Sequence, residues 1–262
     1  MKLARRILIT VGVTLTITFI GIHWVAPVVF SLYSSRKALP ITKVVPTELK
    51  DRSVSQATGT KLSYLGYEFE VPWSDLDESK TERYPQNKPD KSMARLHFRS
   101  GLQSIVITGP PHSMADQMTR TDFKMSPQAF TAVFGQQAAD SDYEFMKRVL
   151  EFSPNKMHPW TLSTTLSSRE QFLLLTKSIV PSKPAETGIF KVRNASCQGF
   201  QQGNPQVRPD SLLLNLYYQN GSIEILLVQK YYGSPGGVTQ PEINRIVQTL
   251  HRSPTQLATS AK

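Results

Sequence analysis

The chain opens with a long apolar stretch, and this feature restricts its fold more than any other. Between Ile7 and Ser35 there is no Asp, Glu, Lys or Arg. A helix needs about 20 apolar residues to cross the hydrocarbon core of a bilayer, so this stretch is long enough to span one. We therefore predict a transmembrane anchor over residues 7–30, preceded by a basic, cytoplasmic N-terminus at residues 1–6.

A secretory signal peptide shares this charge pattern, but it has a shorter apolar core and a cleavage site made of small residues. Here the core is long and the best cleavage candidate, residues 29–31, fits poorly, which favours an uncleaved signal-anchor. Three basic side chains and the α-amino group precede the stretch, whereas Arg36 and Lys37 follow it. The positive-inside rule then favours an extracytoplasmic C-terminal domain.

Three threonines recur every four residues in the predicted anchor. Thr10, Thr14 and Thr18 therefore share one helix face, which could support packing against another transmembrane helix. The alternative is that each hydroxyl bonds its own helix backbone, a use of threonine that membrane helices tolerate. We favour this second interpretation and keep the three residues as candidates for transmembrane packing.

The positive charge of the chain is unevenly distributed. The chain has 30 basic and 20 acidic residues, which gives a net charge of +10. Residues 1–50 hold seven of the basic residues and one of the acidic residues, so they carry +6 of that charge. This excess flanks the predicted membrane segment, where it meets anionic headgroups. The distribution weighs against nucleic-acid binding, which needs a basic patch on the folded domain.

After the anchor we expect a linker over residues 31–59, a globular domain over residues 60–252 and a flexible tail over residues 253–262. The linker is polar, contains two prolines and lacks hydrophobic periodicity. A domain of roughly 200 residues can bury an adequate core. Cys197 is the only cysteine, which excludes an intramolecular disulfide, and we interpret it as a small buried side chain rather than a nucleophile.

Alternating apolar and polar residues predict strands near the start of the domain. Residues 67–71 alternate in this way, and Pro72 ends the strand. Two more strands are expected over residues 94–99 and 103–108. Between them and the first strand, residues 74–92 are highly charged and show no pattern that would form a core, so we expect a loop there.

Helix start signals follow in the middle of the chain. Ser126-Pro127 combines a cap with a proline at the first helical position. Ser141 with Glu144 and Ser167 with Glu170 match the capping box. A fourth signal, at residues 239–242, begins a closing helix with one apolar face, formed by Ile243, Ile246, Val247 and Leu250.

The C-terminal third is predicted to return to strands. Residues 188–193 and 197–201 are expected to pair, and Asn220-Gly221 is the preferred pair for a tight hairpin turn. The register that this turn predicts pairs Tyr218 with Ile223, Leu216 with Ile225, and Leu214 with Leu227.

This order of elements predicts an α+β domain in which helices cover an antiparallel sheet. The opening segment at residues 66–73, the hairpin at residues 211–231 and the closing helix together resemble the Mog1/PsbP-like fold. The resemblance implies a fold for most of residues 60–252. It further implies an interaction module, because domains of this kind mostly bind partners that differ from one to the next.

The sequence lacks the standard motifs for nucleophilic hydrolysis, phosphate or dinucleotide binding and zinc-dependent proteolysis. We therefore assign no catalytic, cofactor-binding or metal-ligating residue and expect no cofactor. Asp75, Asp77 and Glu78 offer oxygen ligands for calcium but lack the glycine and distal glutamate of an EF-hand, so a solvated loop is favoured. His97 and His112 are the candidates if the domain is a hydrolase with a dispersed active site.

Tyrosines near the C-terminus suggest where a partner would bind. Tyr217, Tyr231 and Tyr232 are expected to form an exposed aromatic surface of the kind that binds proteins. The Gly-rich residues 233–237 next to them are favoured as a connector over a functional loop. Asn194 begins an Asn-Ala-Ser sequence, which matches the glycosylation acceptor pattern.

Together these features predict a single-pass protein of a plasma or inner membrane with a non-catalytic, extracytoplasmic interaction domain, which would be periplasmic in a two-membrane cell. Its partners would be the bilayer, through the anchor, and an unknown protein or envelope component, with no nucleic acid. The alternatives are a membrane-anchored hydrolase, whose active site is dispersed along the sequence, and a small accessory subunit of a membrane complex that binds through the transmembrane helix.

Overall fold

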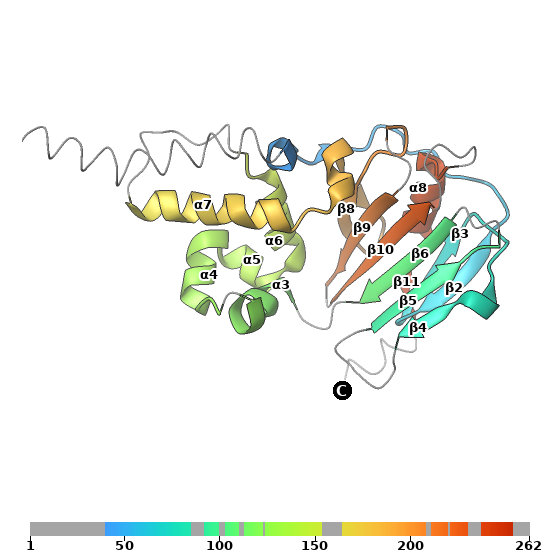
Figure 1. The fold of residues 1–262 in the computed structure, drawn as a ribbon, viewed down its shortest axis with the longest axis horizontal. Helices are drawn as coiled ribbons and strands as arrows, with labels where there is room; N and C mark the ends of the chain where they lie inside the picture. Colours follow the sequence, from blue (N-terminus) through green and yellow to red (C-terminus); the bar gives the residue numbers. More distant parts are fainter. Residues whose placement is uncertain are drawn as a thin grey trace, which may run out of the picture. The chain divides into compact units, whose positions relative to one another are not determined.

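A computed structural model describes residues 40–84, 92–99, 103–109, 113–122, 124–153, 164–207, 211–219, 221–229 and 237–253 (Figure 1). The chain divides into two compact units. The α7 unit comprises Met1–Lys43 and Phe152–Val180. The sheet unit comprises Val44–Glu151 and Pro181–Lys262.

No helix within the described residues combines the length and the apolar character needed to cross a bilayer. The anchor predicted over residues 7–30 lies outside these residues, and so do Thr10, Thr14 and Thr18. The anchor and its packing face therefore stay predictions.

The sheet unit is built on an eight-stranded sheet, in which β1 and β7 are parallel and every other neighbouring pair is antiparallel. The predicted antiparallel sheet is thus confirmed, with β1 as a short parallel addition at one edge. In spatial order the strands are β1 (Thr47–Glu48), β7 (Ile189–Arg193), β8 (Gln198–Gln202), β9 (Ser211–Tyr218), β10 (Gly221–Gln229), β6 (Gln103–Gly109), β5 (Ser92–His97) and β4 (Glu82–Tyr84).

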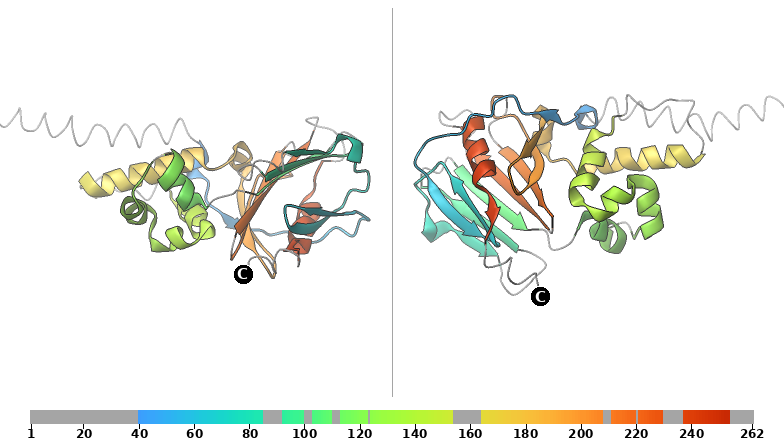
Figure 2. Two further views of the ribbon diagram at one scale, coloured as in Figure 1. Left: turned by 90° about the horizontal axis from the view of Figure 1, so that it is seen from below. Right: turned by 180° about the vertical axis from the view of Figure 1, so that it is seen from behind.

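A second, three-stranded sheet and one helix cover one face of this large sheet (Figure 2). The small sheet has the order β11 (His251–Arg252), β3 (Tyr67–Val71) and β2 (Thr60–Tyr64), and α8 (Gln240–Thr249) packs against β3. The predicted helical cover is therefore present on this face as α8, but the three-stranded sheet beside it was not predicted. Both layers bury their apolar side chains in one cluster, which includes Phe69, Val71, Leu96, Ile105, Ile107, Leu214, Leu216, Ile223, Ile225, Ile243 and Ile246.

Short helices between β6 and β7 form the helical part of the sheet unit. They include α4 (Pro127–Phe134) and α6 (Asp142–Glu151), which bury an aromatic cluster of Phe130, Phe134 and Phe145 with ring centroids 4.8 to 5.8 Å apart. The other short elements of the unit are η3 (Glu78–Lys80), α3 (Met114–Asp116), η4 (Gln117–Asp122), α5 (Gln136–Asp140) and η7 (Lys183–Thr187). The mixed α+β class predicted from the sequence is confirmed.

Two of the predicted helix starts are confirmed in detail. Ser126 caps α4 by accepting a hydrogen bond from the Ala129 N–H, and Thr239 with Glu242 forms the capping box of α8. The predicted apolar face of α8 is buried as expected. Ser141 lies directly before α6, and its hydroxyl accepts a long hydrogen bond of 3.5 Å from the Glu144 N–H.

The α7 unit contains η2 (Pro40–Lys43) and the 16-residue helix α7 (Thr164–Ile179), which pack against each other. The helix start predicted at Ser167 is wrong, because α7 already begins at Thr164. Lys177 is buried in this unit and donates a hydrogen bond of 2.6 Å from Nζ to the Phe152 carbonyl. Burial lowers the pKa of its ammonium group to about 8.

The hairpin of β9 and β10 forms as predicted but in a different register. Tyr218 pairs with Gly221, and Leu216 pairs with Ile223, so the ladder is shifted by two residues from the predicted one. Gly221 is therefore a strand residue rather than a turn residue, and Asn220 lies outside the described residues. A shift of two residues keeps every side chain on its predicted face, which is why the predicted core residues are nevertheless buried.

The C-terminal half of the predicted linker belongs to the folded sheet unit. Thr47 and Glu48 form β1, and the segment that follows runs along α8. Asn244 on α8 donates hydrogen bonds to the carbonyls of Asp51 and Ser53, at 3.0 and 2.7 Å. The linker interpretation fails here because backbone pairing and side-chain amides, rather than apolar periodicity, hold the segment.

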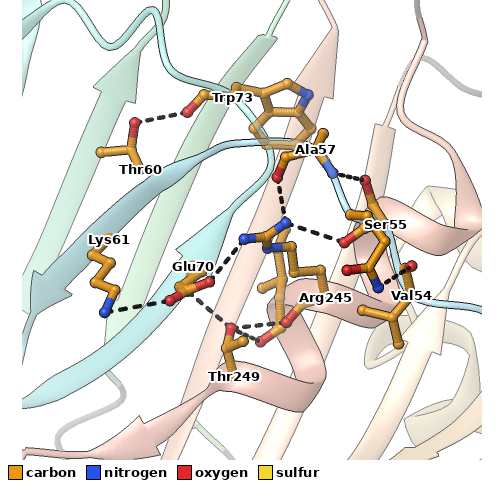
Figure 3. Close-up of polar contacts among 11 residues, drawn as sticks. Val54, Ser55, Ala57, Thr60, Lys61, Glu70, Trp73, Arg245 and Thr249 are labelled. Carbon is orange, nitrogen blue, oxygen red and sulfur yellow. Dashed lines mark hydrogen bonds and ion pairs between the residues drawn. The ribbon is translucent and has the colours of Figure 1, made fainter.

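Arg245 completes this attachment (Figure 3). Its guanidinium donates to the carbonyls of Ser55, at 3.1 Å, and of Ala57, and it forms an ion pair of 2.9 Å with Glu70 on β3. The hydrogen bond from Arg245 is the main reason why the pKa of the Glu70 carboxyl is lowered. One side chain thus connects the former linker, α8 and the small sheet.

Within the charged segment at residues 74–92, the described residues 74–84 form more regular structure than predicted. Residues 82–84 form the edge strand β4, which pairs with β5, and Leu76 forms an isolated bridge with Phe98. Asp77 caps η3 by accepting hydrogen bonds from the N–H and hydroxyl of Ser79, at 3.2 and 2.5 Å. The Asp77 carboxylate thus stabilises the start of η3. Within the described residues, no group of three or more His, Cys, Asp or Glu is placed to hold a metal ion.

Candidate ligand-binding cavity

A cavity of about 710 Å³ lies in the sheet unit, where the start of α6 meets the ends of β7 to β10. One wall comes from Ser113 and the junction of α5 and α6, and the other from the β7–β8 turn and the β9–β10 hairpin. The volume is typical of pockets that take small organic ligands. The lining residues are Ser113, Ala139, Asp140, Ser141, Asp142, Tyr143, Arg193, Asn194, Ala195, Ser196, Cys197, Gln198, Tyr217, Tyr218, Gln219, Gly221 and Ser222.

The face of the large sheet that turns away from the small sheet carries buried polar side chains. Gln202 donates from Nε2 to Oδ1 of Asn215, at 2.7 Å, and Asn215 donates from Nδ2 to Oε1 of Glu224, at 2.8 Å. Gln202 in turn accepts hydrogen bonds from the N–H and hydroxyl of Ser182, at 2.6 and 3.0 Å. This polar chain runs from η7 across β8 and β9 to β10, so the face beside the cavity differs from an ordinary apolar core.

Tyr217 lies on the same face and lines the cavity. It is only 7% exposed, so the exposed aromatic surface predicted for this residue is wrong. The strand alternation puts it opposite the core residue Leu216, and Tyr143 of α6 covers it with ring centroids 6.1 Å apart. Its hydroxyl makes no hydrogen bond within the described residues. Burial, followed by the nearby carboxylates of Glu224 and Asp142, raises its pKa well above the usual value.

Tyr143 connects the helices to the large sheet at this wall of the cavity. Its ring stacks on Phe200 of β8 with a centroid distance of 5.3 Å and an interplanar angle of 6°. It also lines the cavity. Its neighbours Phe145 and Met146 take the core positions of α6 instead.

Asp142 is the first residue of α6 and a partly buried carboxylate in the cavity wall. Oδ1 accepts a hydrogen bond of 2.7 Å from the Met114 N–H, which attaches α6 to the start of α3. Burial raises the pKa of the Asp142 carboxyl, and the charge of Asp116 acts in the same direction. No cation forms an ion pair with this carboxylate among the residues that the structure describes.

Cys197 and Tyr218 line the opposite wall. Cys197 is 7% exposed, and burial raises the pKa of its thiol to about 11, so it is protonated at neutral pH. The prediction that Cys197 is a small buried side chain is thereby confirmed. The Tyr218 hydroxyl is buried beside the Cys197 thiol and Ser196, and burial raises its pKa as well.

Asn194 organises the turn between β7 and β8. Its Nδ2 donates to the carbonyls of Val247 and Leu250, at 2.7 and 2.8 Å, and its Oδ1 accepts from the N–H groups of Ser196 and Cys197. The amide nitrogen that a glycan would occupy is therefore already used in folding. The glycosylation pattern at this position reflects a turn that fixes one rim of the cavity.

The remaining candidates do not meet at this cavity. Tyr231, Tyr232 and His112 lie outside the described residues, as does most of the Gly-rich segment that follows the tyrosines. His97 ends β5, which is separated from β9 in the large sheet by β6 and β10, and it does not line the cavity. Sequence patterns thus located one wall residue, Tyr217, and missed Asp142, whose role depends on a turn between two helices.

Comparisons with known proteins identify no relative for this chain: no protein-family model, curated protein or solved structure matches it. The resemblance to the Mog1/PsbP-like fold therefore stays a prediction. The case for a function must come from the geometry of the cavity itself.

Proposed function

We propose that the chain is a membrane-anchored binding protein whose sheet unit is non-catalytic and takes its ligand in the cavity at the start of α6. One observation carries this proposal: a cavity of about 710 Å³ whose walls include, among the described residues, the Asp142 carboxylate without an ion pair and the Tyr217 hydroxyl without a hydrogen bond. Buried polar groups without hydrogen bonds are costly, and a bound ligand is one way to satisfy them.

The chemistry of the walls favours binding over hydrolysis. A hydrolytic site needs a nucleophile beside a general base, usually a histidine. No histidine belongs to the lining residues that the structure describes, and the Cys197 thiol is in its unreactive, protonated form. His97, the one described candidate of the hydrolase hypothesis, contributes nothing to the cavity.

The binding role is tested by filling the cavity. Ala195 is an exposed lining residue, so Ala195→Trp places a large side chain in the cavity with little effect on the core. Val207, which is 62% exposed and does not line the cavity, supplies the control Val207→Trp. We expect fluorine NMR of the full-length, fluorotyrosine-labelled protein to report binding of some members of a set of small amines, polyols and carboxylates. Ala195→Trp should abolish these signals and Val207→Trp should keep them. Equal responses of the two variants would contradict the proposal.

We further propose that the domain is held on the extracytoplasmic side of a plasma or inner membrane by residues 7–30. The uncharged apolar stretch and the excess of basic residues before it support this topology. A compartment-sensitive reporter fused to the C-terminus should be active only outside the cytoplasm. A reporter active only in the cytoplasm would show that Arg36 and Lys37 set the orientation, and would place the cavity on the cytoplasmic side.

A further inference from the structure

Two polar groups in the walls of the cavity lack the partners that buried groups normally have. Tyr217 is 7% exposed, and its hydroxyl makes no hydrogen bond within the described residues. Asp142 keeps one hydrogen bond, from the Met114 N–H to Oδ1, and no ion pair among those residues. A hydroxyl and a carboxylate together offer several acceptor positions that the N–H groups of a ligand can fill.

The wall of the cavity that holds Asp142 is negatively charged, although the chain as a whole is basic. Asp116 raises the pKa of Asp142 through its own charge, and both Glu224 and Asp142 act on Tyr217 in the same sense. Arg193 also lines the cavity, but it is an exposed residue of the opposite wall and forms no ion pair with Asp142 within the described residues. A partly desolvated carboxylate beside aromatic rings is a setting that attracts a cation.

We infer that the ligand carries an ammonium or guanidinium group that binds between the Asp142 carboxylate and the Tyr217 hydroxyl. This inference rests on the proposed function, because it names the chemistry of the ligand for the same cavity. Either cation brings several N–H donors and no acceptor, which complements this wall. The ring of Tyr143, which contacts the Tyr217 ring and also lines the cavity, adds an aromatic surface.

The size of the cavity indicates that the cation is one part of a larger ligand. An ammonium group fills only a small fraction of about 710 Å³. The same cation could belong to a free organic amine or to the lysine or arginine side chain of a peptide. The chemistry at Asp142 is shared by both sources, and the experiment separates them.

The test compares charged and neutral probes on the full-length protein in lipid nanodiscs. The probes are n-butylammonium, the neutral n-butanol, and an acetylated tripeptide with a central lysine, with its side-chain-acetylated form as neutral control. Fluorine NMR of fluorotyrosine reports binding, and the Tyr217 signal is identified by its loss in Tyr217→Phe. We expect the charged probes to shift this signal and the neutral ones to bind at least about tenfold more weakly, the effect of about 1.4 kcal/mol.

Two matched variants locate the interaction. Asp142→Asn keeps an oxygen for the Met114 N–H and removes the charge, so it should weaken the charged probes at least about tenfold. Asp140→Asn removes an exposed charge from the same wall and should change affinity less than about twofold. Thermal unfolding of each variant checks that it is folded, and the charged-to-neutral ratio in the unmodified protein tests the inference even if Asp142→Asn does not fold.

The outcomes separate the inference from the proposed function. Tighter binding of the lysyl peptide than of n-butylammonium would support a peptide source, and the reverse would support a free amine. Neutral probes that bind as well as charged ones, or an Asp142→Asn variant that binds normally, would overturn the cation inference and leave the cavity as a binding site. Binding that is insensitive to Ala195→Trp would overturn the proposed function as well.

Discussion

The two faces of the large sheet differ in the side chains that they bury, and the central strands β8, β9 and β10 show this difference. On one face, β9 and β10 present Leu214, Leu216, Ile223 and Ile225, all of them fully buried in the apolar core. On the other face, the alternate positions carry a hydrogen-bonded chain of Gln202, Asn215 and Glu224, followed by Tyr217 at the cavity. The comparison teaches that burial alone does not identify a core: the first face stabilises the fold, and the second carries buried polar side chains next to the proposed ligand-binding cavity.

The largest effect is expected on the apolar face. Ile225→Ala removes a fully buried side chain between the two sheets and should lower the free energy of unfolding by about 3 kcal/mol, through lost apolar burial and the space left behind. Chemical denaturation of the full-length protein measures this loss. Ile225→Val is the control and should lose about 1 kcal/mol. A loss below 1 kcal/mol for the alanine variant would mean that this face is not the main core.

Breaking the polar face in the middle should have the next largest effect. Asn215→Ala removes the partner of both Gln202 and Glu224, and we expect a loss of about 2 kcal/mol because two buried polar groups are left unsatisfied. Denaturation of Asn215→Ala, Glu224→Ala and the double variant forms a cycle that measures their coupling. Strict additivity of the two single changes would contradict a connected chain.

Glu224 gives the polar face a characteristic pH dependence. Burial raises the pKa of its carboxyl above 4.5, so the folded protein binds a proton at a pH where the unfolded chain does not. The charged group therefore costs stability above its raised pKa, and stability should increase as the pH falls through that pKa toward 4.5. Glu224→Gln should flatten this slope and change stability at neutral pH by less than about 1 kcal/mol.

The pKa of Asp142 is raised for the same reason, so the slope in Glu224→Gln should be reduced rather than abolished. Thermal unfolding at a series of pH values from about 4 to about 7 provides the measurement. A slope of opposite sign in the unmodified protein would show that other groups dominate its response to acid.

The smallest effect is expected at Tyr217. Because its hydroxyl has no hydrogen bond to lose among the described residues, Tyr217→Phe should change stability by less than about 0.5 kcal/mol. Tyr67→Phe is the matched control, since the Tyr67 hydroxyl donates to the Ser222 carbonyl at 3.3 Å, and it should cost about 1 kcal/mol. A larger loss for Tyr217→Phe than for Tyr67→Phe would reveal a partner of the Tyr217 hydroxyl and remove its role in the cavity.

The sequence predicts the apolar face well because its signals are local. Alternation along β3 and along the hairpin, and the i, i+3, i+4, i+7 pattern of α8, identify buried residues without knowledge of the tertiary structure. The same signals fail for residues 44–57. Asn244 and Arg245 hold this segment, and they lie almost 200 positions away in the sequence, a separation about as long as the whole domain. They fail again at the hairpin register, where the turn pair does not fix the pairing.

The cavity was hard to predict because it is made by residues that look structural in isolation. Asp142 follows a helix cap, Asn194 matches a glycosylation pattern, and Tyr217 sits in an ordinary strand. Only the packing of α6 across β8 and β9, through Tyr143 and Phe200, brings them to one place. A usable signal was nevertheless present: Asn215, between two leucines, and Tyr217, which follows Leu216, carry polar groups in a strand whose residues 214–217 are all buried.

The most direct test of the account is an experimental structure of the full-length protein bound to the tightest of the defined probes. We expect the probe to lie in the cavity at the start of α6, with its cation in contact with the Asp142 carboxylate and the Tyr217 hydroxyl. A probe bound elsewhere on the sheet unit, or a cavity filled by the protein's own side chains, would contradict the claim that the polar face of the sheet serves ligand binding.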